Sequence, residues 1–516
     1  MDPISLSLFV SRMTAVCDDM GAVLQRAALS PNIKDRLDFS CAVFDGDGRL
    51  CAQAAHIPVH LGSMAYAMED IVRRFDWAPG DVVVLNDPFL GGTHLPDVTL
   101  VAPVFGQGRP VAFAANRAHH ANIGSAAPGS MPLSQTLEEE GMVISPVRLL
   151  RGGHADSEVV SRLATIEGGP SDQLPGDFQA QLSAARLGVQ RLESLVEARG
   201  ADVFQDGLVA MNEYAEKLAR EALGDIPDGQ WSFTDYMDSD GAGARDFPIR
   251  ATLTIRGGDW FLDFRGTADQ VSGNINCPFS VTAAAAYYVI RCLLPSHVPD
   301  CAGAFSMLSL SAPRGTLINA VGPAAVAAGN VETSSRVVDV CLGLIAQVLP
   351  EKAAAASQGT MNNVAMGSVD EHQRWDYYET IGGGGGAHPG GEGLCGRHSH
   401  MTNTLNTPIE SLELHYPLRL WRYALRAGSG GEGRFRGGQG VVRDYEFLAP
   451  AEVTLLTERR HRGPWGLAGG EDGRPGLSRL NGDELPAKHY QRVEAGDRLC
   501  IETPGGGGWG SKDQVY

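Results

Sequence analysis

The stretch "NDPFLGGTHLPDVTLVAPVF" (residues 86–105) passes from a glycine-containing loop into an apolar strand. At that transition it places a histidine and an aspartate, His94 and Asp97, three residues apart. A purely structural turn needs its glycines and its Asn-Asp-Pro sequence, but it does not need an imidazole beside a carboxylate. The spacing therefore calls for a chemical explanation.

Strands around this loop bring another histidine towards it. Apolar runs bounded by turn residues predict strands over 82–86, 98–105 and 110–117, and His119 follows just after the last of them. Neighbouring strands bring their ends together, and loops at strand ends commonly carry functional residues. We therefore expect a functional site at this edge.

The rest of the chain alternates between helical and strand periodicity. Apolar residues recur with helical spacing in four segments: 5–28, 178–222, 281–293 and 334–348. The second segment holds two runs that each close on a glycine, which predicts a helical hairpin. Alternation around turn residues predicts a β-hairpin over 41–53 and a C-terminal half that is mostly β.

These patterns predict a mixed α/β fold of the α+β class, with no fixed-period repeat. We divide the chain into three regions: an N-terminal α/β unit over 1–165, a helical hairpin over 166–226 and a β-rich unit over 227–516.

Composition limits the classes of partner. The chain has 516 residues, 43% of them hydrophobic, which is enough for substantial cores. Its 42 basic and 61 acidic residues give a formal charge of −19, which disfavours nucleic acid and anionic membranes. The nine cysteines form no CxxC motif, and we find neither a signal peptide nor a membrane-spanning run. We expect a soluble cytoplasmic protein with reduced thiols.

Glycine is concentrated in three runs, "IGGGGGAHPGGEG", "GSGGEGRFRGGQG" and "TPGGGGWG". The hexapeptide over 428–433 formally matches GxGxxG, but it lacks the strand and helix that flank a dinucleotide site, and the runs contain no GK[ST]. We expect these runs to form turns and close backbone packing, and we do not expect the chain to bind ATP alone.

The residue types around the opening loop suit a metal. His94, Asp97 and His119 offer two imidazoles and one carboxylate, which suit Zn, Mn or Fe, and Asp35 or Asp38 in "NIKDRLDFS" is a candidate for a fourth ligand. In the alternative interpretation, Asp97 caps a turn and the histidines are ordinary buried or surface residues.

Neighbouring histidines are weaker candidates. His120 follows His119 and would point elsewhere from a strand end, so we consider it as a substrate-facing or supporting group. His56 and His60 lie four apart, but Pro58 between them argues for an extended or turn segment, from which they line the same cleft.

Many stretches together resemble the hydantoinase B/oxoprolinase family over nearly the whole chain. This family comprises the B-type subunit of ATP-dependent hydantoinases and related lactamases and the C-terminal half of 5-oxoprolinase. The matching stretches are "NIKDRLDFSCAVFD", "HIPVHLGSM", "NDPFLGGTHLPDVTLVAPVF", "AHHANIGSAAPGSMP", "GNINCPFSVTAAAAYYVIRCLL", "AAGNVETSSRVVDV", "ASQGTMNN", "YYETIGGGGGAHPGGEG", "HSHMTNTLNTPIE", "GSGGEGRFRGGQG" and "TPGGGGWG".

The resemblance implies that His94, Asp97, His119 and Asp35, with Asp38 as the rival of Asp35, hold one divalent metal, Mn²⁺ or Zn²⁺. It also implies an A-type partner, the actin-like ATPase subunit hydantoinase A, which uses ATP and Mg²⁺ to phosphorylate the amide oxygen of the substrate. The expected activity is hydrolysis of a C–N bond in a cyclic amide, such as a hydantoin, 5-oxoproline or a related lactam, by a hetero-oligomer.

The chain departs from the family pattern after "AHHA", where an aspartate is usual and this sequence has Asn122. An amide can hold geometry there but cannot act as a base. Glu139 or Glu140 could serve instead, unless the run "LEEE" is only a solvated charge run. His120, Asn122 and Glu139 are thus our catalytic candidates.

Four further histidines are candidates for substrate contact. His398 and His400 alternate as on a strand, so only one of them would face a given cleft, and His56 and His60 complete the set.

Two other functions stay open at this stage. Related subunits in acetone and acetophenone carboxylases use a similar metal site, although those of the acetone type are considerably longer. A non-catalytic scaffold for the ATPase subunit would be expected if the ligand set were broken, and here the set is intact.

Overall fold

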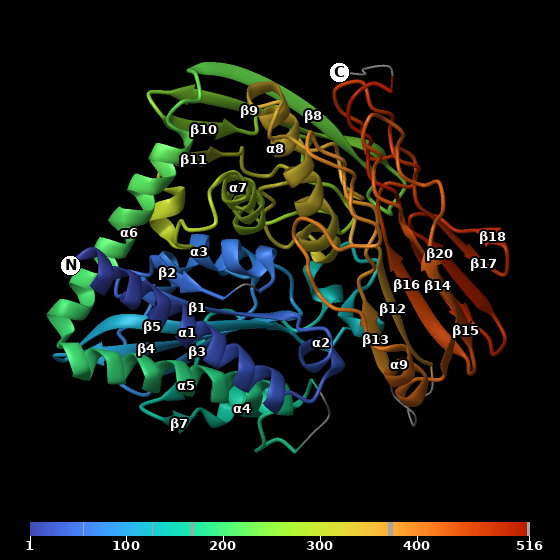
Figure 1. Cartoon of the computed structure of the whole chain (residues 1–516). Coiled ribbons are helices and arrows are strands. Elements are labelled where there is room, and N and C mark those ends of the chain that lie inside the picture. Colours follow the sequence, from blue (N-terminus) through green and yellow to red (C-terminus); the bar gives the residue numbers. More distant parts are fainter. Residues whose placement is uncertain (55, 126, 167–169, 370–374, 513–516) are drawn as a thin grey trace.

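The computed structural model describes residues 1–54, 56–125, 127–166, 170–369 and 375–512. Helices and strands are mixed throughout, as predicted, and they stack as alternating layers with a pair of sheets at the C-terminal side (Figure 1). Among the described residues, no helix combines the length and the apolarity that crossing a bilayer requires.

The N-terminal part is built on one antiparallel sheet with the strand order β2-β1-β5-β4-β3-β6-β7. Its strands are β1 (Phe39–Asp45), β2 (Leu50–Gln53), β3 (Val82–Leu85), β4 (Asp97–Gly106), β5 (Arg109–His119), β6 (Val147–Arg151) and β7 (His154–Ala155). The helices of this part are α1 (Pro3–Ala27), α2 (Pro31–Lys34), α3 (Pro58–Arg73), α4 (Ser157–Ala164), α5 (Gly176–Arg199) and α6 (Ala201–Leu223).

Both faces of this sheet are buried, which explains its nearly continuous apolar strands. Val98, Leu100 and Ala102 of β4 pack in the cluster that contains residues of α5, whereas Val101 packs with α3 on the other face. Successive side chains of a strand point to opposite faces. Whether a residue of β4 or β5 faces α3 or α5 therefore depends on whether its number is odd or even, which we call its parity.

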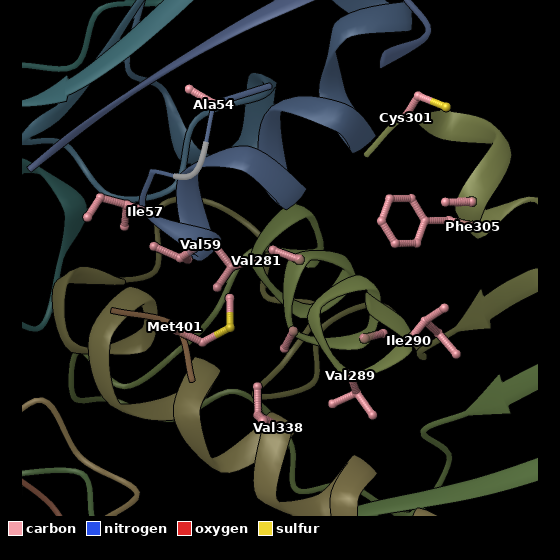
Figure 2. Packing of buried hydrophobic residues seen from close by; sticks show 14 of the residues in the cluster. Ala54, Ile57, Val59, Val281, Val289, Ile290, Cys301, Phe305, Val338 and Met401 are labelled. Carbon is pink, nitrogen blue, oxygen red and sulfur yellow. The ribbon is translucent and has the colours of Figure 1, made fainter. Parts of the chain in front are cut away.

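The middle of the chain adds two layers on the α3 side. Helix α7 (Phe279–Leu293) packs against α3, and α8 (Ser334–Val348) packs against α7 and against strands β8 and β9 of a sheet with the order β11-β10-β9-β8. The strands of that sheet are β8 (Gly229–Ser239), β9 (Arg245–Arg256), β10 (Asp259–Asp263) and β11 (Leu308–Ser311). Figure 2 shows the core where these helices meet, with Val59, Val281 and Val338 in one cluster.

The C-terminal part contains two further sheets, whose buried residues form one shared core. The first has the order β13-β12-β16-β19, formed by Asp376–Glu379, Asn363–Ser368, Ala451–Leu456 and Lys488–Val493. The second has the order β14-β15-β20-β17-β18, formed by Leu418–Leu425, Val441–Phe447, Arg498–Glu502, Leu477–Leu480 and Asp483–Glu484, with α9 (Ile409–His415) beside it.

The three glycine runs pack against one another in this part. Gly438 donates its backbone N–H to Gly385 O at 2.8 Å, and Gly506 donates to Gly438 O at 2.9 Å. A Cβ at Gly506 would lie 1.9 Å from Gly385 O, so no other residue fits there. The predicted close backbone packing is confirmed.

The predicted helices and strands are present close to their expected positions. One local prediction was wrong: Pro58 does not keep its surroundings extended but begins α3, so that His60 is helical. Proline suits the first turn of a helix, where its missing N–H costs nothing.

The two helices predicted as a hairpin are also present. However, α5 packs on α1 and β4, whereas α6 leaves at Gly200 and runs from the first layer towards the upper sheet (Figure 1). The three-region division of the chain stays a prediction.

Candidate metal centre

Three buried side chains meet at one end of β4 and β5. Asp97 opens β4 and pairs directly with His119, the last residue of β5, while His94 precedes them in the loop. Asp97 Oδ1 lies 3.1 Å from His94 Nε2 and 3.1 Å from His119 Nδ1. One ligand atom from each residue lies within 4.8 Å of the others.

Strand parity explains why these residues share a face. Asp97 and His119 have the parity of Val101 and Ala115, which face α3. His120 has the opposite parity; its Nε2–H donates to Gln181 Oε1 on α5 at 2.9 Å. The structure thus separates the two adjacent histidines.

The Gly-Gly pair lets the loop fold tightly behind His94. Gly91 has a φ of +111°, and a Cβ at Gly92 would lie 2.2 Å from Asn86 O. Arg117 Nη2 donates to Gly91 O at 2.9 Å, and Ser280 Oγ donates to Gly92 O at 3.0 Å. Side chains from β5 and α7 therefore hold the loop in place.

The second oxygen of Asp97 is held by three groups. Thr93 Oγ1 donates to Oδ2 at 2.6 Å, Asn330 Nδ2 donates at 3.2 Å, and His60 Nε2 lies 3.2 Å away. His60 Nε2 also lies 3.8 Å from Asp38 Oδ1. The carboxylate is thus fully surrounded, with Oδ1 facing the two other members of the group.

The later parts of the chain complete the walls. Asn330 belongs to a π-helix over Gly329–Thr333, a rare geometry that is frequent at functional sites. Tyr378 of β13 stacks on His119, with ring centroids 4.8 Å apart and planes 12° apart. The Arg36 guanidinium lies 4.9 Å from the centre of the same tyrosine ring.

Electrostatics favour an ionised carboxylate between imidazoles. Burial by itself would raise the pKa of Asp97, but His60 and His94 hold it well below its ordinary value. Burial lowers the pKa of His119, which favours the neutral imidazole. Burial acts in the same direction on His94, yet Asp97 outweighs it and raises the pKa of that imidazole.

The donor set fits a divalent metal. His119 Nε2 is buried and has no hydrogen-bond partner among the described residues, and the buried His94 Nε2 makes no well-aligned hydrogen bond there, although Asp97 Oδ1 lies 3.1 Å away. Buried polar atoms are nearly always satisfied, so these two nitrogens, on rings that flank one carboxylate, point to a missing ligand. Imidazole and carboxylate together suit Zn²⁺ or Mn²⁺ better than Mg²⁺.

Asp38 makes contacts at the edge of this group. Asp38 lies near His60, and its backbone carbonyl accepts from His119 N at 3.0 Å. Asp35 is a half-buried residue at the C-terminal end of α2, and neither aspartate is a member of the metal-competent group among the described residues.

The other catalytic candidates are engaged in local structure. Asn122 Oδ1 accepts from Gly124 N at 2.6 Å within a loop. Glu139 is exposed, and its carboxylate accepts from Gln135 N at 2.8 Å. Along with His120, these residues are not part of the group that the structure brings together.

Among the proposed substrate contacts, only His60 contacts the group. His56 Nδ1 accepts from Cys41 N at 3.1 Å, and its ring lines a separate cavity of about 190 Å³ with Tyr287 and Tyr288. Burial lowers the pKa of His56 to about 4, and the neighbouring His60 acts in the same direction to a smaller extent.

The two histidines of "HSH" are not members of the group, and the prediction that they alternate on a strand was wrong, because the stretch is irregular and His400 has a φ of +59°. His398 has both ring nitrogens buried, and burial, with Arg36 and Arg443 nearby, lowers its pKa to about 3. His400 Nε2 lies 3.3 Å from Asp339 Oδ1 of α8.

Several contributing residues were not singled out from the sequence. Thr93, Asn330 and Tyr378 touch the group, although all three lie in stretches that carried the family resemblance. Glu140, which the sequence offered as the alternative to Glu139, is the buried member of the acidic run, and burial raises its pKa to about 7. Only their place in a shared motif could have pointed to them.

Known proteins resemble the chain in sequence and in fold. The family model described as hydantoinase B/oxoprolinase matches residues 2–512. The 5-oxoprolinase of Dictyostelium discoideum is 38% identical over 530 residues, which cover 100% of this chain and 41% of that protein. The chain thus spans about two fifths of the length of this curated relative.

Two solved structures share the fold. The ATP-dependent caprolactamase from Pseudomonas jessenii superposes with a TM-score of 0.92 at 27% identity, covering 99% of this chain and 91% of that chain. The nucleotide-free structure of an ATP-dependent acetone carboxylase gives a TM-score of 0.87 at 17% identity, covering 99% and 76%. The second likeness shows the fold alone.

Proposed function

The chain belongs to the hydantoinase B/oxoprolinase family, and on that premise we propose that it is the metal-dependent subunit of an ATP-dependent amidohydrolase. The substrate class is a cyclic amide, such as a hydantoin, 5-oxoproline or a related lactam, whose C–N bond is hydrolysed. The observation that carries the proposal is the buried group of His94, Asp97 and His119, with two imidazole nitrogens that make no well-aligned hydrogen bond among the described residues.

We place ATP chemistry on an A-type, actin-like ATPase partner, with its own ATP and Mg²⁺, in a hetero-oligomer. Phosphorylation of the amide oxygen there would turn a poor electrophile into one with a good leaving group. Two observations support this division. The glycine runs of this chain are packed against each other, and the matched 5-oxoprolinase is more than twice as long as the matched region.

Within this chain, His94, Asp97 and His119 would hold the metal, and we favour Asp38 over Asp35 as a fourth ligand. A divalent metal held there supplies Lewis acidity towards a water molecule or a substrate oxygen. The residues do the rest. Asp97 stays ionised between the imidazoles, and His60 lies between the carboxylates of Asp97 and Asp38.

The imidazole of His94 is fixed by a backbone contact. Its Nδ1–H donates to Ala327 O at 3.2 Å, which leaves Nε2 free to bind the metal.

We favour a hydrolase over the two alternatives. The likeness to acetone carboxylase is at the level of fold, whereas the caprolactamase is more similar in sequence and matches over nearly its whole chain. A scaffold that only binds the ATPase subunit would not need a buried, mutually oriented ligand set.

The metal is tested by elemental analysis of the purified chain, for which we expect about one Mn²⁺ or Zn²⁺ per chain. His94→Ala and Asp97→Ala should abolish the bound metal, while His154→Ala, which removes an exposed imidazole on β7, should leave it unchanged. Folded His94→Ala and Asp97→Ala proteins that hold the parental amount of metal would contradict the site.

The catalytic role is tested by assaying His119→Ala together with the ATPase subunit. We expect ring opening to be lost while assembly persists, so that phosphate release continues without ring-opened product. Both products should be measured in one reaction, for parent and variant. Parental product formation by an assembled His119→Ala complex, or ATP hydrolysis by this chain alone, would refute the proposal.

A further inference from the structure

Glu140 is a buried acid that lies outside the proposed ligand set. Its Oε1 accepts three hydrogen bonds: from Ser134 Oγ at 2.7 Å, from Val326 N at 2.8 Å and from Ala327 N at 2.9 Å. Two of these donors are backbone groups 186 and 187 residues further along the chain. The carboxylate therefore ties the acidic run to a distant segment.

That segment is the beginning of a helix. Residues 327 and 328 are helical and continue through the π-helix over Gly329–Thr333 into α8. The first N–H groups of a helix have no partner within it, and a negative charge is favourable at that end. No residue of the segment's own sequence caps it, so Glu140 supplies the acceptor from another part of the fold.

The same segment contacts two members of the proposed metal centre. Ala327 O accepts from His94 Nδ1 at 3.2 Å, and Asn330 Nδ2 donates to Asp97 Oδ2 at 3.2 Å. The two residues that make these contacts, Ala327 and Asn330, lie at most four residues from Val326, whose backbone N–H donates to Glu140. A shift of this backbone would disturb both ligands together.

We propose that Glu140 is a positioning residue for the metal centre: it holds the backbone over 326–330 so that Ala327 orients His94 and Asn330 orients Asp97. This inference rests on the proposed function, because it takes His94 and Asp97 as metal ligands. Glu140 itself makes no hydrogen bond or ion pair with either of them among the described residues, so its positioning effect passes through the segment, in addition to a charge interaction with His94.

The test is the metal affinity of the full-length chain, measured by competition with a chelator for Zn²⁺ and for Mn²⁺. Glu140→Ala should weaken binding about 10- to 100-fold, the usual effect of losing a group that orients a ligand. Glu140→Gln keeps an acceptor oxygen and should recover part of the loss. Glu138→Gln alters the exposed acid two residues away and should bind as the parent does.

Two further measurements separate positioning from general destabilisation. The visible absorption of the Co²⁺-loaded chain reports ligand geometry, and it should change in Glu140→Ala and not in Glu138→Gln. Asn330→Ala combined with Glu140→Ala should give less than the sum of the two single losses in binding free energy, because both act through one segment.

The outcomes are distinct. A parent chain that binds no metal would refute the proposed function. If the parent binds metal and a folded Glu140→Ala protein binds equally well, the inference fails and the proposed function stands. If Glu140→Ala does not fold, Glu140→Gln decides: weaker binding at an unchanged unfolding temperature supports the inference, and parental affinity overturns it.

Discussion

Replacing Gly92 by alanine tests how the Gly-Gly loop places His94. The φ of Gly92 is one that any residue can adopt, so the obstacle is steric. An added Cβ would lie 2.2 Å from Asn86 O and 2.8 Å from Asp87 O, whereas ordinary contacts begin at 3.4 Å. The backbone must therefore separate by about 1 Å, and overpacking of this kind costs about 1–3 kcal/mol.

Asn86 cannot yield easily, because its side chain donates to Leu95 O and Met142 O and accepts from Ile144 N. The loop that carries His94 must move instead. Metal ligands tolerate displacements of only about 0.2 Å, so we expect the metal affinity of Gly92→Ala to fall at least about tenfold.

Gly108→Ala provides the matched control. Gly108 has a φ of +79° in the β4–β5 turn, and an added Cβ there meets nothing within 4 Å. This variant should lose about 1 kcal/mol of stability through backbone strain and keep its metal affinity. Chelator competition on both variants is the assay. A folded Gly92→Ala chain with parental affinity, or an equal loss in Gly108→Ala, would refute the reasoning.

Two further predictions concern buried ion pairs. Although burial favours the neutral acid, Arg459 and Arg336 hold the pKa of Asp235 at about 2, below the ordinary 3.8. Its charge therefore contributes about 2 kcal/mol to the free energy of unfolding, a contribution that is present above pH 3.8 and is lost as the pH falls through about 2. The free energies of unfolding of the parent and Asp235→Asn, measured in urea, should therefore differ at pH 7 and converge near pH 2. Glu379→Gln should lower the free energy of unfolding by about 3–5 kcal/mol, because it leaves the buried Arg443, 2.6 Å away, without a counter-charge. The unfolding temperature should fall accordingly.

Each of these predictions has a clear contrary result. A stability difference between parent and Asp235→Asn that does not change with pH would show that the loss is one of packing and not of charge. An unfolding temperature of Glu379→Gln equal to that of the parent would show that Arg443 finds another partner or remains solvated.

Much of the fold and part of the site could be inferred from the sequence, because the period of a helix or strand is a local property of the chain. The apolar periodicity of α1, α7 and α8 predicted these helices close to their observed bounds. The spacing of His94 and Asp97, with His119 one strand crossing later, predicted that all three would meet, because a strand pair aligns its two ends.

Parity along a strand also separated His119 from His120 in principle, but the sequence alone could not say which face held the site. That choice depended on α3, which brings His60 beside Asp97. The same holds for Asp38 and Asp35: they lie three residues apart, and only the packing of the following strand shows which one faces the group.

Tertiary structure alone brought in the contributions from far along the chain. Asn330 lies 233 residues from Asp97, and the carboxylate of Glu140 lies next to backbone donors 186 and 187 residues away. The run of three glutamates looks uniform as sequence, yet only Glu140 is buried, since the segment around Ala327 packs against that position. Such contacts follow from how complete layers stack, a property that no local spacing encodes.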